Sequence, residues 1–384
     1  MKKHIFNAGP AILPDEVLQR ASESVVEYDG SDMSLLTISH RGKEFEKILE
    51  ESRQMVKDLL GVPNEYDVLF LQGGASMQFC MVPYNLLDDG KTASYIDTGS
   101  WANKAIKEAK FFGNVNVVAS SEDDGYTYIP KDYTISDKSQ YLHITTNNTI
   151  YGTQFHQEPN TYIPLVADMS SDLFSRRIDP SEFDLIYAGA QKNLGPAGVT
   201  LVITKKDIGN RVKRDIPTML DYQTHIDKGS AFNTPPVFAI YVCYLTLQWL
   251  RDNGGIKAME ETNKQKAATL YEEIDKNPLF KGVAHQDDRS YMNATFVINE
   301  PGLEATFLKE AEQEGFSGLK GHRSVGGFRA SLYNALPIEE VTALGRFILD
   351  SCYLRVGLLE VIVPLFFQAL LKIQYSINGS HISK

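Results

Sequence analysis

The sequence predicts an α/β protein with a large, mostly parallel sheet flanked by helices, followed by a smaller α+β domain. Between residues 66 and 205, short apolar runs alternate with helix-like segments, which is the pattern of strands joined by crossover helices. Beyond about residue 255 the pattern changes to long charged helices with one further apolar run. A chain of 384 residues is long enough for two such domains.

The N-terminal part predicts two helices between residues 15 and 60. The segments PDEVLQRASESVVEY and GKEFEKILEESRQMVKDLLG place apolar residues three and four positions apart, and the second ends at Gly61, a typical helix stop.

Seven apolar runs then predict the strands of the large sheet. They are YDVLFLQ, TASYIDTG, VNVVAS, QYLHITTN, IPLVADMSS, DLIYAGA and VTLVITK. Helical segments such as ASMQFCMVPYNLL and SWANKAIKEAKFFG lie between some of them. Sheets of this kind bind ligands outside the carboxyl ends of their strands, so the residues that follow the runs are the candidates for a site.

The C-terminal part predicts the smaller domain. It contains IKAMEETNKQKAATLYEEIDKN, SYMNATFVI, LEATFLKEAEQEG and GLKGHRSVGGFRASLYNALP. We therefore expect a large domain over residues 1–255 and a small α+β domain over 256–349. Residues 350–384 form a tail whose apolar part is interrupted by Arg355, Glu360 and Pro364. This apolar part is too short to span a bilayer. We expect this tail to pack on the small domain or to be poorly ordered.

Composition restricts the partners and the compartment. Hydrophobic residues at 43% and charged residues at 23% are typical of a folded, soluble protein. The net charge of -11 argues against binding to nucleic acid or to anionic membranes, so an anionic ligand needs a local cluster of cations. Cys80, Cys243 and Cys352 are widely spaced, which predicts neither disulfides nor a metal site. These features, with a polar N-terminus that lacks a signal peptide, favour a cytoplasmic location.

Lys192 stands out because LIYAGAQKNLGPAGVTLVI places this one cation between two apolar runs. A lysine in such a loop is most often a solvated surface residue. The alternative is an amine held in a cleft at the end of a strand, where desolvation lowers its pKa and makes it a nucleophile toward an aldehyde.

Three further features follow predicted strands. In FLQGGASMQF, two glycines precede Ala75 and Ser76 at the start of a helix, where free backbone amides bind phosphate, although such turns are often only tight turns. Trp101 opens a helix at an exposed corner, where its ring could stack on a planar cofactor. Asp168 ends an apolar run and is either a helix cap or the partner of a protonated pyridine nitrogen. Together with Lys192, these features indicate a pyridoxal phosphate site.

With these features the chain resembles the phosphoserine aminotransferase family, in the class V branch of the fold type I pyridoxal phosphate enzymes. The matching motifs occur in order over about residues 4–349: FNAGPAILP, SHRGKEF, LQGGAS, GSWANKA, NNTIYGT, VADMSSD, AGAQKNLGPAG, FNTPPVFAIY and GLKGHRSVGGFRASLYNA. The chain departs from the family pattern at Phe328, where methionine is more usual, and in the tail after residue 349.

The resemblance implies a role for each matching residue. Lys192 would bind the cofactor aldehyde covalently and act as the catalytic base, and Asp168 would keep the pyridine nitrogen protonated. The other cofactor-binding residues would be Ala75, Ser76, Trp101, Thr149, Gln191, Asn233 and Thr234. Asn233 and Thr234 would come from the neighbouring subunit, which implies a homodimer, and residues 1–15 would pack as an arm on the small domain.

The resemblance also implies the substrates. L-glutamate would give its amino group to 3-phosphohydroxypyruvate, yielding O-phospho-L-serine and 2-oxoglutarate on the route to L-serine. A four-carbon phosphorylated analogue on the route to vitamin B6 stays open as a second substrate. Arg329 would hold the α-carboxylate, while His40 and Arg41 of the partner, with His322 and Arg323, would bind the distal anion. Each His-Arg pair taken alone is more often a solvated loop pair.

Two alternatives stay open from the residues. One is another class V enzyme: a serine or alanine aminotransferase that uses glyoxylate, or a cysteine desulfurase, which needs a nucleophilic cysteine on a mobile loop. The other is a non-enzymatic protein that binds a phosphorylated metabolite.

Overall fold

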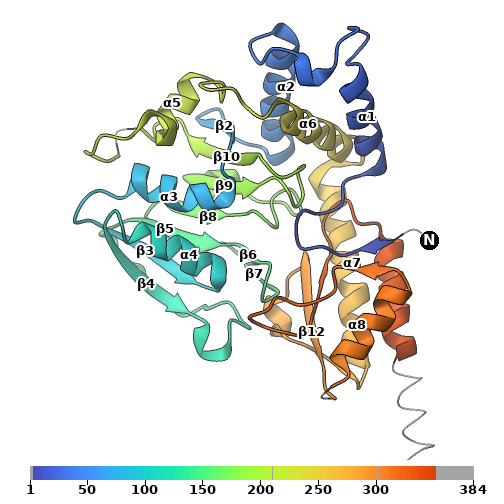
Figure 1. Ribbon diagram of the computed structural model, residues 1–384. Coiled ribbons are helices and arrows are strands. Elements are labelled where there is room, and N and C mark those ends of the chain that lie inside the picture. Colours follow the sequence, from blue (N-terminus) through green and yellow to red (C-terminus); the bar gives the residue numbers. More distant parts are fainter. Residues whose placement is uncertain (1–2, 210, 301, 352–384) are drawn as a thin grey trace, which may run out of the picture.

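The computed structural model describes residues 3–209, 211–300 and 302–351 (Figure 1). The expectations for the apolar tail concern residues that lie, apart from 350 and 351, outside the described ranges. Within those ranges, no helix is both long and apolar enough to cross a membrane.

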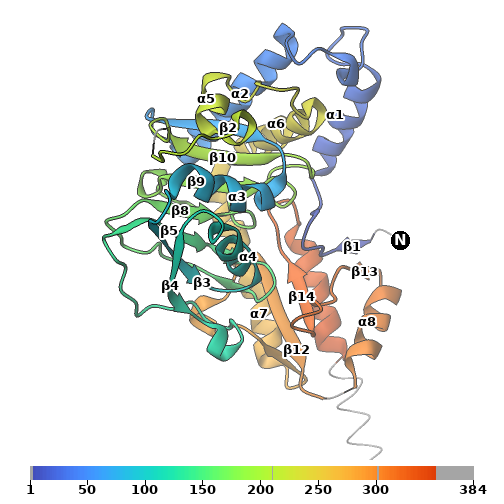
Figure 2. The ribbon, with the colours of Figure 1, turned by 60° about the vertical axis from the view of Figure 1, so that its left-hand side comes forward.

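A seven-stranded sheet forms the centre of the molecule (Figures 1 and 2). Its strands are β2 (Tyr66–Leu71), β3 (Thr92–Asp97), β4 (Asn114–Ser120), β5 (Ser139–Thr145), β8 (Leu165–Asp168), β9 (Leu185–Gly189) and β10 (Thr200–Lys205). The spatial order is β2-β10-β9-β8-β5-β3-β4. Strand β10 runs antiparallel to both neighbours, with Val202 opposite Leu69 and Tyr187, and the remaining pairs are parallel. The mostly parallel seven-stranded sheet is thus confirmed.

Helices cover both faces of this sheet. Along β2, Val68 and Phe70 pack with α1 (Asp15–Val26), α2 (Lys43–Leu60) and α6 (Val237–Asp252). The alternate residues Leu69 and Leu71 pack with α3 (Gly74–Leu86), α4 (Ser100–Ala109) and α5 (Tyr222–Asp227). Successive strand side chains point to opposite faces, so a strand covered on both sides must be apolar throughout, which is why these runs lack alternation.

The C-terminal part forms a second layer of structure beside the sheet. Strands β11 (Phe280–Gly282), β12 (Asn293–Ile298) and β14 (Phe328–Ser331) pair antiparallel in the order β11-β12-β14. They pack with α8 (Glu304–Gln313), with the later part of α7 (Gly255–Lys276) and with a last helix over residues 338–351. In this core Phe328 contacts Phe296 and Phe307, so an aromatic ring fills the position where the family more often has methionine.

Two features connect the chain's two ends and its two cores. Strand β1 (His4–Ile5) pairs parallel with β13 (Phe316–Ser317), and Phe6 is fully buried in the C-terminal core. Helix α7 belongs to both cores, because Ile256 packs with the large sheet and Leu270 with the small one. We therefore propose the division into domains with α7 as the shared element and residues 1–15 as an arm of the small domain.

The short elements complete the described chain. Strands β6 (Asn147–Asn148) and β7 (Thr153–Gln154) form a hairpin next to β5. Single 3₁₀ turns occur at Leu35–Thr37, Glu122–Asp124, Pro180–Glu182, Thr218–Leu220 and Gln286–Asp288.

Lys266 of α7 is a fully buried cation that holds the chain after β14. Its ammonium donates to the carbonyl oxygens of Leu332, Tyr333 and Leu336 at 2.8, 2.8 and 3.2 Å. Burial lowers the pKa of this amine to about 7. Three converging carbonyl acceptors match the three donors of an ammonium group.

We expect Lys266→Met to reduce the free energy of unfolding by about 2–3 kcal/mol, because buried carbonyls that lose their donor retain their desolvation cost. Urea unfolding followed by circular dichroism measures the change. Lys257→Met, at an exposed position of the same helix, is the control and should change stability by less than about 0.5 kcal/mol. Equal stabilities of the two variants would contradict this role for Lys266.

Candidate active site

The site lies where β8, β9 and the β6–β7 hairpin end. Asp168 is the last residue of β8, and Lys192 lies three residues after β9. The Lys192 ammonium donates to the Thr149 hydroxyl at 3.0 Å, and its Nζ lies 5.9 Å from the centroid of the Trp101 ring. Four residues that are far apart in the sequence therefore meet at the carboxyl end of the sheet, as expected for a parallel sheet.

The surroundings of Lys192 lower the pKa of its amine. Desolvation lowers its pKa to about 8, with Arg329 acting in the same direction, while the carboxylates of Asp168 and Asp172 oppose the shift. A lysine of pKa 8 has a far larger neutral fraction near neutrality than an ordinary lysine. Lys192 is partly buried and its ammonium is bound to Thr149, so it is not a freely solvated loop residue.

Competitive labelling with acetic anhydride tests this pKa. Only the neutral amine reacts, so labelling of Lys192 in the cofactor-free protein should rise with pH to a midpoint near 8. The reference is the ordinary lysine value of about 10.4. A midpoint for Lys192 at that value would show that its amine is not desolvated.

Asp168 is a buried carboxyl with 4% of its surface exposed. Burial raises its pKa, while hydrogen bonds from Ser170 and the charge of Lys192 lower it. The Ser170 amide donates to its Oδ1 at 2.9 Å. The chain after Asp168, up to residue 175, forms turns and no helix. Asp168 therefore fixes a turn, and the interpretation of Asp168 as a helix cap is wrong.

Trp101 lies in the first turn of α4 and faces the site. Its indole N–H is buried and has no partner among the described residues. Lys104, one turn further along α4, places its ammonium 4.2 Å from the centroid of the Trp101 ring. Both ammonium groups near this ring are within range of a cation–π attraction.

The first turn of α3 provides free backbone amides. The helix begins at Gly74 after Gly73, which has φ 89°, so Ala75 and Ser76 lie in its first turn as the sequence predicts. A Cβ at position 73 would lie 2.5 Å from that of Met77, so only glycine fits this turn. The first amides of a helix have no intrahelical acceptor and bind anions readily.

Arg329 reaches the site from β14 of the small domain. Its Nη1 donates to the Thr149 carbonyl at 3.2 Å, while its Nε is buried without a partner among the described residues. Desolvation lowers its pKa. His322 lies in the loop before β14, and its own pKa is lowered by desolvation and by the charges of Arg329, Arg323 and Lys104. Arg329, Arg323 and Lys104 therefore form one positive group around His322, and Arg329 also acts on Lys192.

Other residues of the prediction are not brought to Lys192 within one chain. His40 and Arg41 lie in the segment that joins the turn Leu35–Thr37 to α2. In the described structure they make no hydrogen bond or ion pair with a residue of the site. Asn233 and Thr234 lie before α6, where the Thr234 carbonyl accepts from Gln72 at 3.2 Å.

Gln191 connects the site to the N-terminal arm. Its carbonyl accepts from the Ala11 amide at 2.8 Å, and the Ala8 carbonyl accepts from the Tyr333 hydroxyl at 2.9 Å. A Cβ at Gly9 would lie 3.6 Å from the Lys192 side chain, in ordinary contact. The arm thus packs directly behind the lysine, and the side-chain role of Gln191 toward a phosphate stays a prediction.

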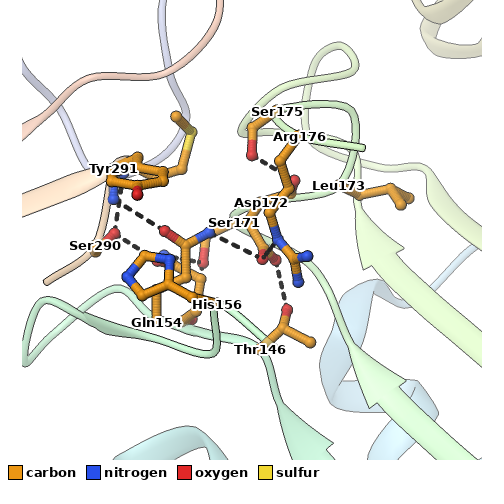
Figure 3. A network of polar contacts seen from close by, with 12 residues as sticks. Thr146, Gln154, His156, Ser171, Asp172, Leu173, Ser175, Arg176, Ser290 and Tyr291 are labelled. Atoms are coloured by element: carbon orange, nitrogen blue, oxygen red, sulfur yellow. Dashed lines mark hydrogen bonds and ion pairs between the residues drawn. The ribbon is translucent and has the colours of Figure 1, made fainter. Parts of the chain in front are cut away.

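A buried polar network beneath the site was not foreseen from the sequence (Figure 3). Asp172 accepts from Thr146 at 2.5 Å and from Gln154 at 3.3 Å, and it pairs with Arg176 at 3.4 Å. Desolvation raises its pKa, and Arg176 opposes the rise. The pair fixes the turn after Asp168, so it supports the site without facing a ligand.

A chain of hydroxyls leads from this network to Lys192. Thr149 donates to the Ser171 hydroxyl at 3.1 Å, and Ser171 donates to the Asn147 carbonyl at 2.9 Å. This fixes the Thr149 hydroxyl as the acceptor of the Lys192 ammonium. In the sequence, Ser171 and Asn147 could have been found because they are polar residues that follow buried strands.

The residues present fit pyridoxal phosphate. An indole N–H and a guanidinium Nε lie buried without partners, free helix amides are available for a phosphate, and a buried carboxyl accompanies a lysine of lowered pKa. The indole, the helix amides, the carboxyl and the lysine are matched by groups of that cofactor: a polar aromatic ring, a phosphate, a pyridine nitrogen and an aldehyde. The guanidinium is left for a substrate carboxylate. Among the described residues, no group of side chains has the arrangement of a metal site.

The two described cysteines do not have the properties of a desulfurase nucleophile. Cys80 lies in α3 with its pKa raised by burial and by Glu108, and Cys243 is fully buried in α6 with its pKa raised by desolvation. A reactive thiol needs a lowered pKa and access.

Comparison with known proteins identifies the class. The family model for "Aminotransferase class-V" matches residues 4–344, so the chain belongs to the class V aminotransferase family. Within that family the similarity is to phosphoserine aminotransferases. That of Parabacteroides distasonis is 58% identical over 346 residues, which cover 90% of this chain and 97% of the relative.

Solved structures agree with this. Phosphoserine aminotransferase from Bacillus circulans subsp. alkalophilus superimposes with a TM-score of 0.89 at 48% identity, covering 91% of this chain and 98% of that one. The pyridoxal phosphate-bound enzyme from Trichomonas vaginalis gives a TM-score of 0.86 at 37% identity, covering 90% and 99%.

Proposed function

We propose that the chain is a pyridoxal phosphate-dependent transaminase that transfers the amino group of L-glutamate to 3-phosphohydroxypyruvate, yielding O-phospho-L-serine and 2-oxoglutarate. The observation that carries the proposal is the desolvated Lys192 amine, held by Thr149 beside Asp168 and the Trp101 ring. Arg323 and Arg329 of the small domain form no ion pair with a described carboxylate, and Arg329 acts on this amine, which suits a doubly anionic substrate. This function places the enzyme in L-serine biosynthesis.

The residues divide the work of the reaction. Bound pyridoxal phosphate supplies an aldehyde that bonds to amines and a pyridinium ring that withdraws electrons. Lys192 holds the aldehyde between turnovers and, once displaced by glutamate, its free amine removes the proton from the substrate Cα. Lys192 would return this proton to the carbon that carried the aldehyde, and in the second half-reaction it would move a proton in the opposite direction, to the carbon that becomes Cα of O-phospho-L-serine. Asp168 keeps the ring nitrogen protonated.

The remaining residues of the site bind and orient. The N-terminal turn of α3, with Ala75 and Ser76, is proposed to bind the cofactor phosphate, and Trp101 to cover the ring; the free amides of that turn and the indole near Lys192 support this. Arg329 is proposed to hold the α-carboxylate that both substrates share, because a planar guanidinium binds a carboxylate through two parallel hydrogen bonds. His322 and Arg323 are proposed to bind the distal anion.

Arg329→Ala and His322→Ala should have separable effects. Losing a charge-assisted hydrogen bond of about 1.5–3 kcal/mol corresponds to roughly ten to over a hundred fold in kcat/KM. Arg329→Ala should lower kcat/KM by this factor for glutamate and phosphoserine alike. His322→Ala should affect phosphoserine more than unphosphorylated serine. Equal losses for phosphoserine and serine in the His322 variant would place the phosphate contact elsewhere.

A comparison of amino acceptors tests the proposed function itself. With glutamate as donor, kcat/KM is measured for 3-phosphohydroxypyruvate, pyruvate and glyoxylate. The phosphorylated acceptor should be preferred strongly. Preference for glyoxylate or pyruvate would identify a different class V aminotransferase, and failure to turn over any acceptor would favour a metabolite-binding protein.

We also propose a homodimer with shared sites and a cytoplasmic location. His40 and Arg41 match a family motif but make no hydrogen bond or ion pair with a described residue of the site in their own chain, which supports their acting on a second copy. Asn233 and Thr234 lie beside the start of α3 in their own chain, where Thr234 accepts from Gln72, and their action across the dimer is proposed from the family motif alone. Light scattering should give twice the chain mass of 43.0 kDa, and a monomeric mass would contradict the proposal. Cys80 and Cys243 are free thiols, which supports a reducing compartment, and fractionation of cells tests it.

A further inference from the structure

Lys104 is an exposed lysine of the motif GSWANKA, and the proposed mechanism gives it no role. It lies on α4, three residues after Trp101, and three residues apart on a helix means the same face. Its ammonium lies 4.2 Å from the centroid of the Trp101 ring, and that of Lys192 lies 5.9 Å from the same centroid. Both amines therefore lie near the same indole ring, and so near each other.

The charges around Lys104 are unbalanced. Although the chain has 49 acidic and 38 basic residues, no carboxylate of the described structure forms an ion pair with Lys104, His322, Arg323 or Arg329. Glu108 is four residues after Lys104, at the spacing that pairs charges on a helix. It instead accepts from the Cys80 thiol at 3.5 Å. Lys104 therefore forms no ion pair with Glu108 and is available to an external anion.

Lys104 also acts on the residues proposed to bind the distal anion. Its charge, with those of Arg323 and Arg329, lowers the pKa of His322 after desolvation. Three permanent cations thus act on an imidazole whose one polar side-chain partner within the described residues is the Ser324 hydroxyl, at 2.7 Å. Repulsion within such a group is relieved when a dianion binds among its members.

We propose that Lys104 is a specificity-determining residue that binds the phosphate of the phosphorylated substrate from the α4 side, opposite the His322–Arg323 loop. The inference rests on the proposed function and adds a residue to its substrate site. A monoanionic or neutral side chain in the same place gains less from Lys104, so the residue contributes to discrimination and not to the chemical step.

The test compares phosphoserine with unphosphorylated L-serine in the holoenzyme. Lys104→Ala should lower kcat/KM for phosphoserine about tenfold, the lower end of what a charge-assisted hydrogen bond contributes. It should leave serine within about twofold, and Lys104→Arg should restore most of the loss because the cation remains. The control is Lys107→Ala, which removes an exposed cation about 4.5 Å further along the same helix, and should change neither substrate.

A second readout does not depend on turnover. In Lys104→Ala the pKa of His322, followed by NMR and assigned by loss of its signal in His322→Gln, should rise, since one repelling charge is removed. Unchanged phosphoserine-to-serine ratio and unchanged His322 pKa in Lys104→Ala would overturn the inference while the proposed function stands. A wild-type enzyme with no preference for phosphoserine over serine would overturn the proposed function and the inference with it.

Discussion

We expect Lys192→Ala to abolish transamination and to leave the fold intact. The same amine bonds to the cofactor aldehyde and carries the proton, and proton transfer by a positioned group alone contributes typically 10² to 10⁴ fold to the rate. Folding should survive, because the buried amine is held at a desolvation cost and Thr149 keeps its hydrogen bond to Ser171. Single-turnover transfer from glutamate and far-UV circular dichroism measure the two effects.

Lys257→Ala is the control for this experiment, since it removes a surface lysine from the same protein. It should retain full activity. Near-normal turnover in Lys192→Ala, with the fold preserved, would assign both the covalent bond and the proton transfer to another residue.

Asp168→Asn should have the second largest effect. Removing one partner of a buried charge pair costs about 3–5 kcal/mol, which corresponds to a loss of roughly 10² to 10⁴ in rate if the cofactor nitrogen is that partner. Asparagine is nearly isosteric and can still accept from the Ser170 amide, so the turn after β8 is retained. The substitution therefore separates the charge of Asp168 from its structural role.

The measurement is the rate of each half-reaction together with the absorption spectrum of the bound cofactor. Thermal unfolding of the same variant checks that the turn is intact. If spectrum and rate both match those of the wild type, Asp168 serves only to fix the turn.

The sheet was predictable from the sequence because its strands are buried on both faces and therefore appear as continuous apolar runs. The predicted run DLIYAGA contains β9 (Leu185–Gly189), and VTLVITK contains β10 (Thr200–Lys205). The antiparallel placement of β10 between β2 and β9 was not predictable, because strand order depends on long-range contacts that leave no local pattern. The packing of α7 was not predictable for the same reason, because its two ends pack in different cores.

The cofactor side of the site was predictable because its residues follow strands in short motifs. Lys192, Asp168, Thr149 and Trp101 come together as expected. The Asp172–Arg176 pair and Lys266 were missed, because a charged residue in a sequence is normally solvated and only the tertiary structure shows its buried partners. Lys104 was missed for a related reason: on a helix rich in lysine, only its place over Trp101 distinguishes it.

Peptide mapping of the borohydride-reduced holoenzyme tests the central claim most directly, since reduction makes the bond between cofactor and amine permanent. The cofactor mass should appear on the peptide that contains Lys192, with Lys104 and Lys266 unmodified, and should be absent from that peptide in Lys192→Ala. Cofactor mass on any other lysine, or none on the Lys192 peptide of an active enzyme, would contradict the assignment of this residue and of the site built around it.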